Sequence, residues 1–251
     1  MRNIKLIISY DGTDFFGWQK QPEQRSVQKT ISQVLSEMLN EEIKIIGASR
    51  TDSGVHAIEQ TANFFTTRNI PNNKLLHALG SYLPKDIAVI SAEDVAEDFN
   101  SRFSAVGKHY RYFINTNFCP DPFQRRYCWW YRRKLHLNKM QNAVEYMIGT
   151  LDWSGIKIIT DDENESAIRT INKIEINEKN NVFTIDVYGI NFMYKQVRSI
   201  VGILVSAALE RLVPNEIPEI LCGKIKKKYD VAPASGLFLQ KVYYDIKDFN
   251  L

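Results

Sequence analysis

Apolar and polar positions in the first hundred residues follow the periods of strands and helices in turn. Residues 4–10, IKLIISY, predict a buried strand, and the DGT that follows predicts a turn in which Gly12 adopts a positive φ. Apolar residues recur with helical spacing over residues 27–40, and Ser26 stands where it would cap that helix. The other elements that we expect here are strands at 43–47, 58–66 and 86–92 and a helix at 72–82 that ends before Pro84. The predicted order is βαββαβ.

The second half of the chain shows a similar mix of elements. It predicts strands at 108–117, 167–177, 181–190 and 237–246, and helices at 138–149, 192–212 and 214–222. The two central strands are joined by the polar turn EKNN, and Pro214 ends the long helix. The similar order indicates two related α+β lobes with a boundary near residues 104–107. We therefore expect an N-terminal domain of residues 1–105 and a C-terminal domain of residues 106–251.

Length and composition place the chain among ordinary globular proteins. It has 251 residues, of which 44% are hydrophobic and 24% charged, enough to bury a sizeable core. Its three cysteines include no CxxC pair, so neither a disulfide framework nor a zinc site is expected. The N-terminus does not resemble a signal peptide, and no apolar run is long enough to span a membrane. We expect a cytoplasmic protein that binds neither a membrane nor a metal.

The distribution of charge says more than the net charge of +3. Basic residues cluster in two stretches, at 125–134 and 224–228, and aromatic residues interleave with the first of them. Such a mixture suits a phosphate backbone and unstacked bases, although a strand with a solvated charged face would have the same composition. Charge alone leaves both interpretations open.

The most polar short segment is SRTDSGVHA, residues 49–57, which lies between two predicted strands. Polar side chains on a loop held by rigid strands often carry function. The residues are equally compatible with a turn in which Asp52 bonds the backbone and Gly54 takes the positive φ. GxGxxG, Walker, HExxH and GxSxG motifs are absent from the sequence. Redox, phosphoryl-transfer and metal-hydrolysis functions therefore have no support.

The same segment closely resembles the RTD-A-G-V-H signature of the TruA family of tRNA pseudouridine synthases. Other segments resemble motifs of that family in the same order along nearly the whole chain. They are YDGTDFFGWQKQ at 10–21, the Val27–Gln28 pair, LPKDI at 83–87, FNSRFSAVGKHYRYFI at 99–114, GINFMYKQVRSIVG at 189–202 and APASGLFLQKVYY at 232–244. One such match would be weak evidence, but several in order are specific.

The resemblance implies a fold, an activity and partners. The fold is α+β, with two βαββαβ-like lobes that join their antiparallel sheets into one extended mixed sheet with a central active-site cleft. The activity is conversion of uridines 38, 39 and 40 in the tRNA anticodon stem-loop to pseudouridine, by a homodimer. This isomerisation oxidises nothing, so no cofactor or metal is expected. Arg132 and Arg133, with the lysines of 224–228, are then expected to bind the tRNA.

The resemblance also assigns site residues. Asp52 is the expected nucleophile, Tyr110 lies against the target base, and Arg198 is the cation that keeps Asp52 ionised. Arg50 is expected to fill the gap left by the flipped uridine or to hold the displaced nucleotide, and Leu237 to pack on the base. From the residues alone, each has a simpler interpretation. They are a turn for Asp52, a sheet or core position for Tyr110 and Leu237, and a solvated surface for Arg198 and Arg50.

The chain departs from the family pattern at a few positions. Ser49, Ser53 and Glu59 replace residues common in the family, and LDWS at 151–154 replaces an HDF segment. These departures leave open the same chemistry on another RNA or at only some of the three tRNA positions. An RNA-binding module without catalysis is the other alternative, although binding alone needs no carboxylate beside the RNA. A small-molecule enzyme has little support.

Overall fold

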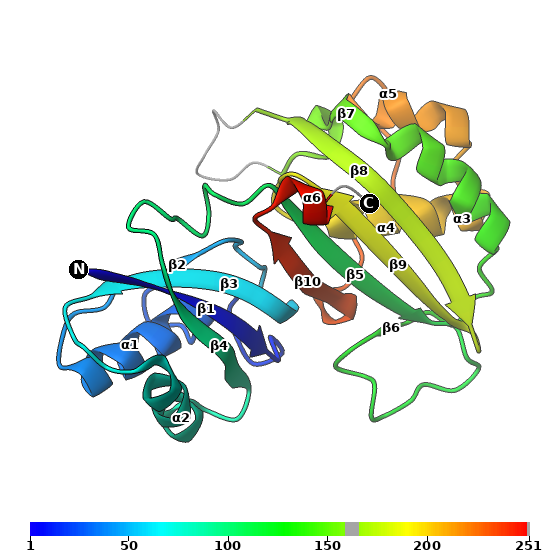
Figure 1. The fold of residues 1–251 in the computed structure, drawn as a ribbon. Coiled ribbons are helices and arrows are strands. Elements are labelled where there is room, and N and C mark those ends of the chain that lie inside the picture. The colour runs from blue at the N-terminus through cyan, green and yellow to red at the C-terminus, as the bar shows by residue number, and fades with distance from the viewer. Residues whose placement is uncertain (159–165, 250–251) are drawn as a thin grey trace. The chain divides into compact units, whose positions relative to one another are not determined.

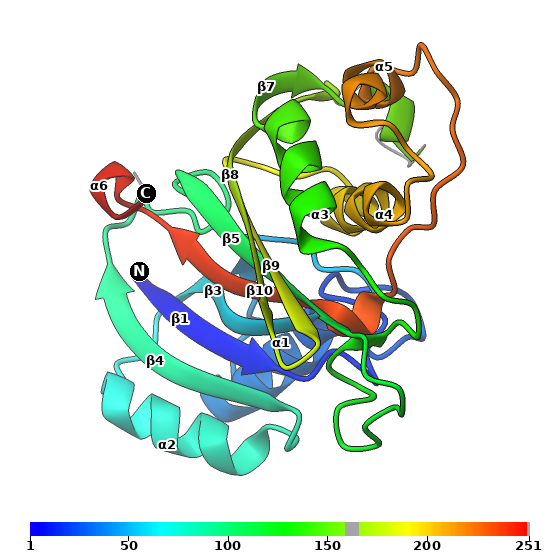
Figure 2. The same cartoon turned by 90° about the vertical axis from the view of Figure 1, so that its right-hand side faces the viewer.

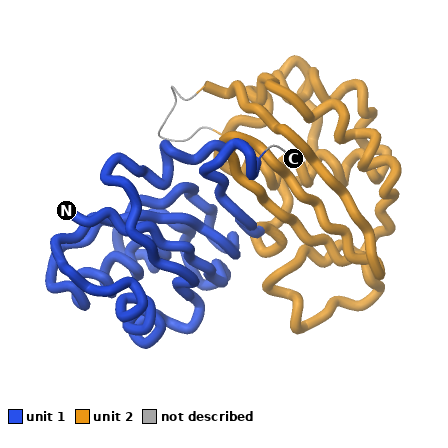
Figure 3. Tube along the Cα trace, viewed as in Figure 1, with its two compact units in different colours: residues 1–106, 238–251 blue, residues 107–237 orange. Residues whose placement is uncertain are grey.

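The computed structural model describes residues 1–158 and 166–249. The chain forms two compact units, which we call unit 1 (residues 1–106 and 238–251) and unit 2 (residues 107–237) (Figure 3). The chain passes from unit 1 to unit 2 after Val106 and returns to unit 1 at Phe238.

Unit 1 is built on a mixed sheet. β1 (Arg2–Tyr10) pairs antiparallel with β3 (His56–Thr66) on one side and with β4 (Ile87–Val95) on the other. β2 (Ile46–Gly47) pairs antiparallel with β3, and β10 (Leu237–Tyr243) pairs parallel with it. The pairing of β10 with β3 explains why the C-terminal segment joins unit 1. The sequence predicts a longer second strand, over residues 43–47, than the two residues found.

Two helices cover one face of this sheet (Figures 1 and 2). α1 (Val27–Leu39) and α2 (Asn72–Tyr82) agree with the predicted ranges. The Ser26 hydroxyl accepts a hydrogen bond from the Lys29 amide at 3.4 Å, so the predicted N-cap is confirmed. Asn40 ends α1 with a φ of 48°, a conformation that asparagine tolerates better than most residues.

Unit 2 contains an antiparallel sheet in the order β5-β9-β8-β7. These strands are β5 (Gly107–Asn115), β9 (Val182–Gly189), β8 (Ile168–Lys179) and β7 (Gly149–Asp152). The short β6 (Trp129–Trp130) pairs parallel with β5. β8 and β9 form the hairpin that the polar turn predicts, and Asn180 and Asn181 both have positive φ, as its tight geometry requires.

The helices of unit 2 lie on one face of its sheet (Figure 2). α3 (Leu137–Val144) packs on β8 and on α4 (Gln196–Ala208). The short helices of the chain are α5 (Ile217–Leu221), α6 (Ile246–Phe249) and the 3₁₀ turns Glu145–Met147, Ser154–Ile156, Pro214–Glu216 and Ala234–Gly236. Among residues 1–158 and 166–249, no helix is both long and apolar enough to cross a membrane.

The structure confirms an α+β fold with mixed sheets and corrects several element boundaries. The predicted helix over residues 192–212 is wrong at both ends, since α4 spans only Gln196–Ala208. Lys195 has a φ of 58°, which a helix interior does not allow, so the helix begins after it. β6 and β7 escaped prediction because strands of two and four residues show no measurable alternation.

Candidate active site

Asp52 lies in unit 1, on the turn that leads into β3. Its side chain is partly buried, Thr51 beside it is buried and Arg50 is exposed. The Val55 amide donates a hydrogen bond to the Asp52 carbonyl at 3.1 Å, and Gly54 has a φ of 77°. The positive φ predicted for Gly54 is therefore confirmed, and the turn is closed by the main-chain carbonyl of Asp52, whose side chain is partly buried.

The segment after β1 presses closely against this turn. The Trp18 amide donates to the Thr51 carbonyl at 3.1 Å. A Cβ atom at Gly17 would lie 2.6 Å from the same oxygen, and one at Gly12 would lie 1.9 Å from the carbonyl oxygen of Val55. Only glycine permits either approach. Gly12 does not have the positive φ expected from the sequence, and close packing explains its presence instead.

Side chains add further support to the turn. The Tyr10 hydroxyl lies 2.7 Å from that of Thr51. The Gly12 amide donates to Nδ1 of His56 at 3.0 Å. Because Nδ1 accepts this bond it carries no proton, so its contact with Asp11 at 3.2 Å is not an ion pair. His56 is 1% exposed and its ring stacks on Phe238, so it has a structural role beside the turn.

In unit 2, Tyr110 points from β5 into a buried aromatic setting. It is 6% exposed, and its ring meets Phe192 edge-on, with 5.0 Å between the ring centroids. Tyr112, two residues further along the same face, donates its hydroxyl to the Pro233 carbonyl at 2.7 Å. A Cβ at Gly236 would lie 2.6 Å from the Tyr112 ring, so the chain around residues 233–236 packs directly on β5.

Arg198 forms hydrogen bonds with Ala232, which directly precedes the residues 233–236 that pack on β5. Its Nε donates to the Ala232 carbonyl at 2.7 Å, and the Ala232 amide donates to the Arg198 carbonyl at 3.1 Å. One turn further along α4, a Cβ at Gly202 would lie 1.9 Å from the Asp230 carbonyl oxygen. Burial raises the pKa of the Tyr112 phenol, and the nearby positive charge of Arg198 opposes the rise. Arg198 is thus an oriented charge close to Tyr112.

The remaining predicted residues also lie in unit 2. Leu237 is 5% exposed at the start of β10. Arg132 and Arg133 are exposed just after β6, and the Arg132 guanidinium lies 5.4 Å from the centre of the Phe118 ring. Phe118 and Phe123 are themselves largely exposed, which is unusual for phenylalanine and typical of interaction surfaces.

The structure therefore groups the predicted residues by unit. Asp52 and Arg50 share the turn of unit 1, whereas Tyr110, Arg198 and Leu237 belong to unit 2. Sequence reasoning missed the interactions that hold them, namely the glycine-dependent packing beside the turn and the two hydrogen bonds between Arg198 and Ala232. The glycines were visible in the sequence, but what they pack against was not.

Comparison with known proteins decides the family. The model of a protein family described as tRNA pseudouridine synthase matches residues 6–104 and 143–245. The chain belongs to this family. The tRNA pseudouridine synthase A of Acetivibrio thermocellus is 38% identical over 97% of this chain and 100% of its own length. The tRNA pseudouridine synthase A 2 of Clostridium perfringens is 40% identical with the same coverage.

The family resemblance found in the sequence is thus confirmed, and the chain is a tRNA-modifying isomerase. A solved structure titled as a Cbf5-Nop10-Gar1 complex aligns with 80% of this chain and 53% of its own, at 13% identity and a TM-score of 0.34. A likeness at that level adds nothing to the assignment.

Proposed function

We propose that this chain converts uridines 38, 39 and 40 of the tRNA anticodon stem-loop to pseudouridine, with Asp52 as nucleophile. The observation that carries the proposal is the Asp52 turn, a partly buried carboxylate on a backbone held by close packing on Gly12 and Gly17. A catalytic group must be held in a fixed geometry to be effective, and this turn supplies one. The positions follow from the matched family motifs.

The chemistry explains the residue types. Breaking the N1–C1′ bond of uridine and joining C5 to C1′ rearranges one nucleoside, with a proton lost at C5 and one gained at N1. A carboxylate can attack carbon or stabilise positive charge, which is the role proposed for Asp52. Tyr110 lies against the base and assists proton transfer at C5. Arg198, charged at every working pH, favours the ionised form of the Asp52 carboxylate.

The target uridine must leave its stack before it can react, and flipping costs a few kcal/mol. We assign Arg50, exposed two residues before Asp52, to the space left by the flipped nucleotide. Leu237 packs on the extruded base. Both roles concern binding, so truncation of either residue should weaken catalysis less than loss of Asp52.

The deciding experiment is pseudouridine formation on unmodified tRNA, mapped by position, for the wild type and Asp52→Asn. Asparagine keeps the shape of the side chain and removes the charge and the nucleophile. We expect the wild type to modify positions 38 to 40, and Asp52→Asn to form no pseudouridine while its tRNA affinity stays within about twofold. Asp98→Asn, at an exposed aspartate of the same unit, is the matched control and should keep full activity.

Three outcomes would contradict parts of this proposal. Activity retained by Asp52→Asn would remove Asp52 as nucleophile. Wild-type product at only one or two of the three positions would restrict the proposed substrate to those positions. Product at other uridines would show that the proposed positions are wrong.

The homodimer that the family resemblance implies is tested by light scattering. A dimer requires a particle of twice the chain mass of 29.1 kDa.

The exposed basic stretch after β6 is the surface proposed to bind tRNA. Arg132→Glu/Arg133→Glu should lower tRNA affinity and flatten its dependence on salt, by roughly one unit of slope for each phosphate that the variant no longer binds. Lys44→Glu/Lys74→Glu reverses the same charge at two exposed lysines of unit 1. If both double variants lose affinity equally, the effect is one of net charge and the assignment to this stretch is wrong.

A further inference from the structure

A buried carboxylate ties together two residues of β5. Oδ1 of Asp186, on β9, lies 2.5 Å from Nε2 of His109 and accepts a hydrogen bond from Nε of Arg111 at 2.7 Å. Its second oxygen accepts from Nη2 of Arg111 at 3.3 Å. The Asp186 side chain is 6% exposed, and a carboxylate only accepts, so Nε2 of His109 carries the hydrogen.

The two residues held in this way are the neighbours of Tyr110 on either side. Side chains alternate along a strand, so His109 and Arg111 share one face of the sheet and Tyr110 points to the other. Tyr110 lies opposite Val187, which lies opposite Ile174, on the face that α3 covers. The carboxylate therefore holds β5 from the face opposite Tyr110, through both residues that flank the proposed catalytic tyrosine.

This support lies near one end of the β5–β9 ladder. The ladder between β5 and β9 ends at the pair Lys108–Gly189, two residues from Tyr110. On the far side of β9, the pairing with β8 shifts register between Ile171 and Lys173, beside the same end. Strand ends and bulges lose ladder hydrogen bonds, so side chains must supply the missing constraint.

A second contact from β9 reinforces the first. The Tyr188 ring stacks on His109, with 4.1 Å between ring centroids and 14° between planes. Four residues after Tyr188, the chain places Phe192 against the edge of the Tyr110 ring. Residues of β9 thus contact His109 and Arg111 on one face of β5, and Phe192, three residues after the end of β9, contacts the Tyr110 ring on the other.

We propose that Asp186 is a positioning residue for catalysis, because its carboxylate holds His109 and Arg111 and so fixes the Tyr110 ring against the uridine. The inference rests on the role proposed above for Tyr110. A merely structural network would affect the amount of folded enzyme. A positioning network affects the rate of the folded enzyme, since small displacements of reacting groups lower rates steeply.

The test compares Asp186→Asn with the wild type in steady-state pseudouridine formation over a range of tRNA concentrations, corrected for the folded fraction. We expect kcat to fall about tenfold with KM within about twofold, because asparagine carries no charge and replaces the oxygen that accepts from Nη2 of Arg111 with an NH2 donor. Arg111→Gln breaks the same network from the β5 side, and the same pattern is expected. It serves as the second variant if Asp186→Asn folds poorly.

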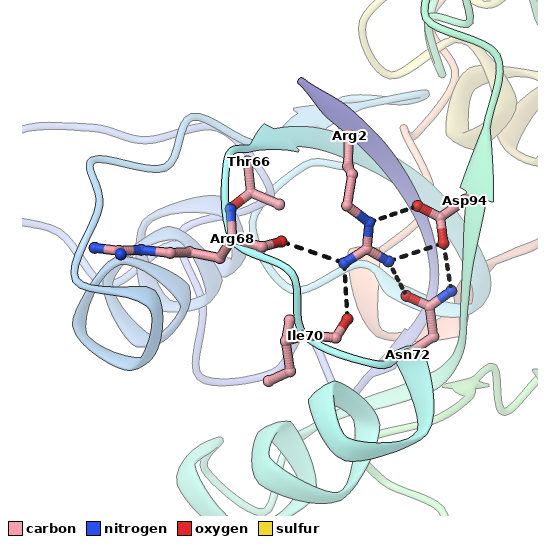
Figure 4. A network of polar contacts seen from close by, with 6 residues as sticks. All are labelled: Arg2, Thr66, Arg68, Ile70, Asn72 and Asp94. Carbon is pink, nitrogen blue, oxygen red and sulfur yellow. Dashed lines mark hydrogen bonds and ion pairs between the residues drawn. The ribbon is translucent and has the colours of Figure 1, made fainter.

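The matched control is Asp94→Asn in unit 1. Asp94 also accepts two hydrogen bonds from one arginine, Arg2, and a third from Asn72 (Figure 4). The substitution removes the same charge from a network of similar size outside the proposed site. It should leave kcat within about twofold of the wild type. A fall in kcat equal to that of Asp186→Asn would overturn the positioning role.

A double variant separates this inference from the function on which it rests. If Asp186 acts by placing the Tyr110 hydroxyl for proton transfer, then adding Asp186→Asn to Tyr110→Phe should lower the residual rate by much less than tenfold. A full tenfold loss in that background would mean that Asp186 does not act through that hydroxyl. Full activity of Tyr110→Phe alone would instead remove the role of Tyr110, whatever Asp186 does. Wild-type kcat in Asp186→Asn with activity lost in Tyr110→Phe refutes only the role of Asp186.

Discussion

Two aspartates, Asp94 and Asp186, each hold an arginine across neighbouring strands, yet their surroundings differ. Asp94 joins β4 to β1 and to the start of α2, and Arg2 also donates to the carbonyls of Arg68 and Ile70 (Figure 4). Half of the Asp94 side chain is exposed, against 6% for Asp186. The chemistry of the pair is the same, but the solvent around it is not.

Exposure to solvent decides how much each ion pair contributes to the stability of the fold. Water and salt screen an exposed ion pair, which typically contributes about 1 kcal/mol or less. A buried carboxylate depends on its partners, since removing one side of a buried pair leaves a charge or donor without compensation. Asp94 therefore links exposed segments at the edge of the unit 1 sheet, whereas Asp186 is part of a buried network in unit 2.

Position along the strand decides what each network controls. Asp94 connects segments that carry none of the proposed site residues. Asp186 connects the two residues that flank Tyr110 on β5. An ion pair gains a functional role from the residues that its partners flank, and its strength alone does not predict that role.

The largest expected effect that would sharpen this comparison is on stability. Asp186→Ala should lower the free energy of unfolding by about 2–3 kcal/mol, because Arg111 and His109 lose their shared acceptor. Asp94→Ala should lower it by about 1 kcal/mol or less. Urea unfolding followed by tryptophan fluorescence measures both. Equal losses in the two variants would show that exposure does not separate the networks.

The sequence predicted the regular parts of the fold because they depend on local pattern. The stripe over 27–40 and the cap at Ser26 gave α1 almost to the residue, and the EKNN turn gave the β8–β9 hairpin. The predicted helix over residues 192–212 began too early because residues 192–195 continue its apolar pattern. The positive φ of Lys195 and the bond from the Met193 amide to Gln196, which set the true start, leave no periodic signal.

The candidate site, like the fold, could be predicted from the sequence only in part. Motif resemblance pointed to Asp52, Tyr110 and Arg198, and no composition or spacing would have found them without it. The interactions that hold these residues join segments far apart in the sequence. Asp186 is 77 positions from His109, and a lone aspartate in an alternating strand is usually solvent-facing. Only the register of β5 against β9 reveals what it faces.

The smallest expected effect is the acid dependence of the same two networks. Burial acts to raise the pKa of Asp186, but hydrogen bonds from His109 and Arg111 and the charge of Arg111 outweigh it, so the pKa lies below its ordinary value. Hydrogen bonds from Arg2 and Asn72 lower the pKa of Asp94.

A carboxyl whose pKa is lower in the folded state stabilises that state at pH values above its unfolded pKa, about 3.9. It loses this contribution as the pH falls through the folded pKa. The stability gap between the wild type and Asp186→Asn should thus narrow as the pH falls below about 4. The gap for Asp94→Asn should narrow over the same window but start smaller, because solvent screens that pair. Urea unfolding at pH 7, 5, 4 and 3.5 gives both gaps. A gap for Asp186→Asn that widens as the pH falls from 4 to 3.5 would mean that the ionised carboxylate destabilises the folded state, and the contrast between the two networks would be reversed.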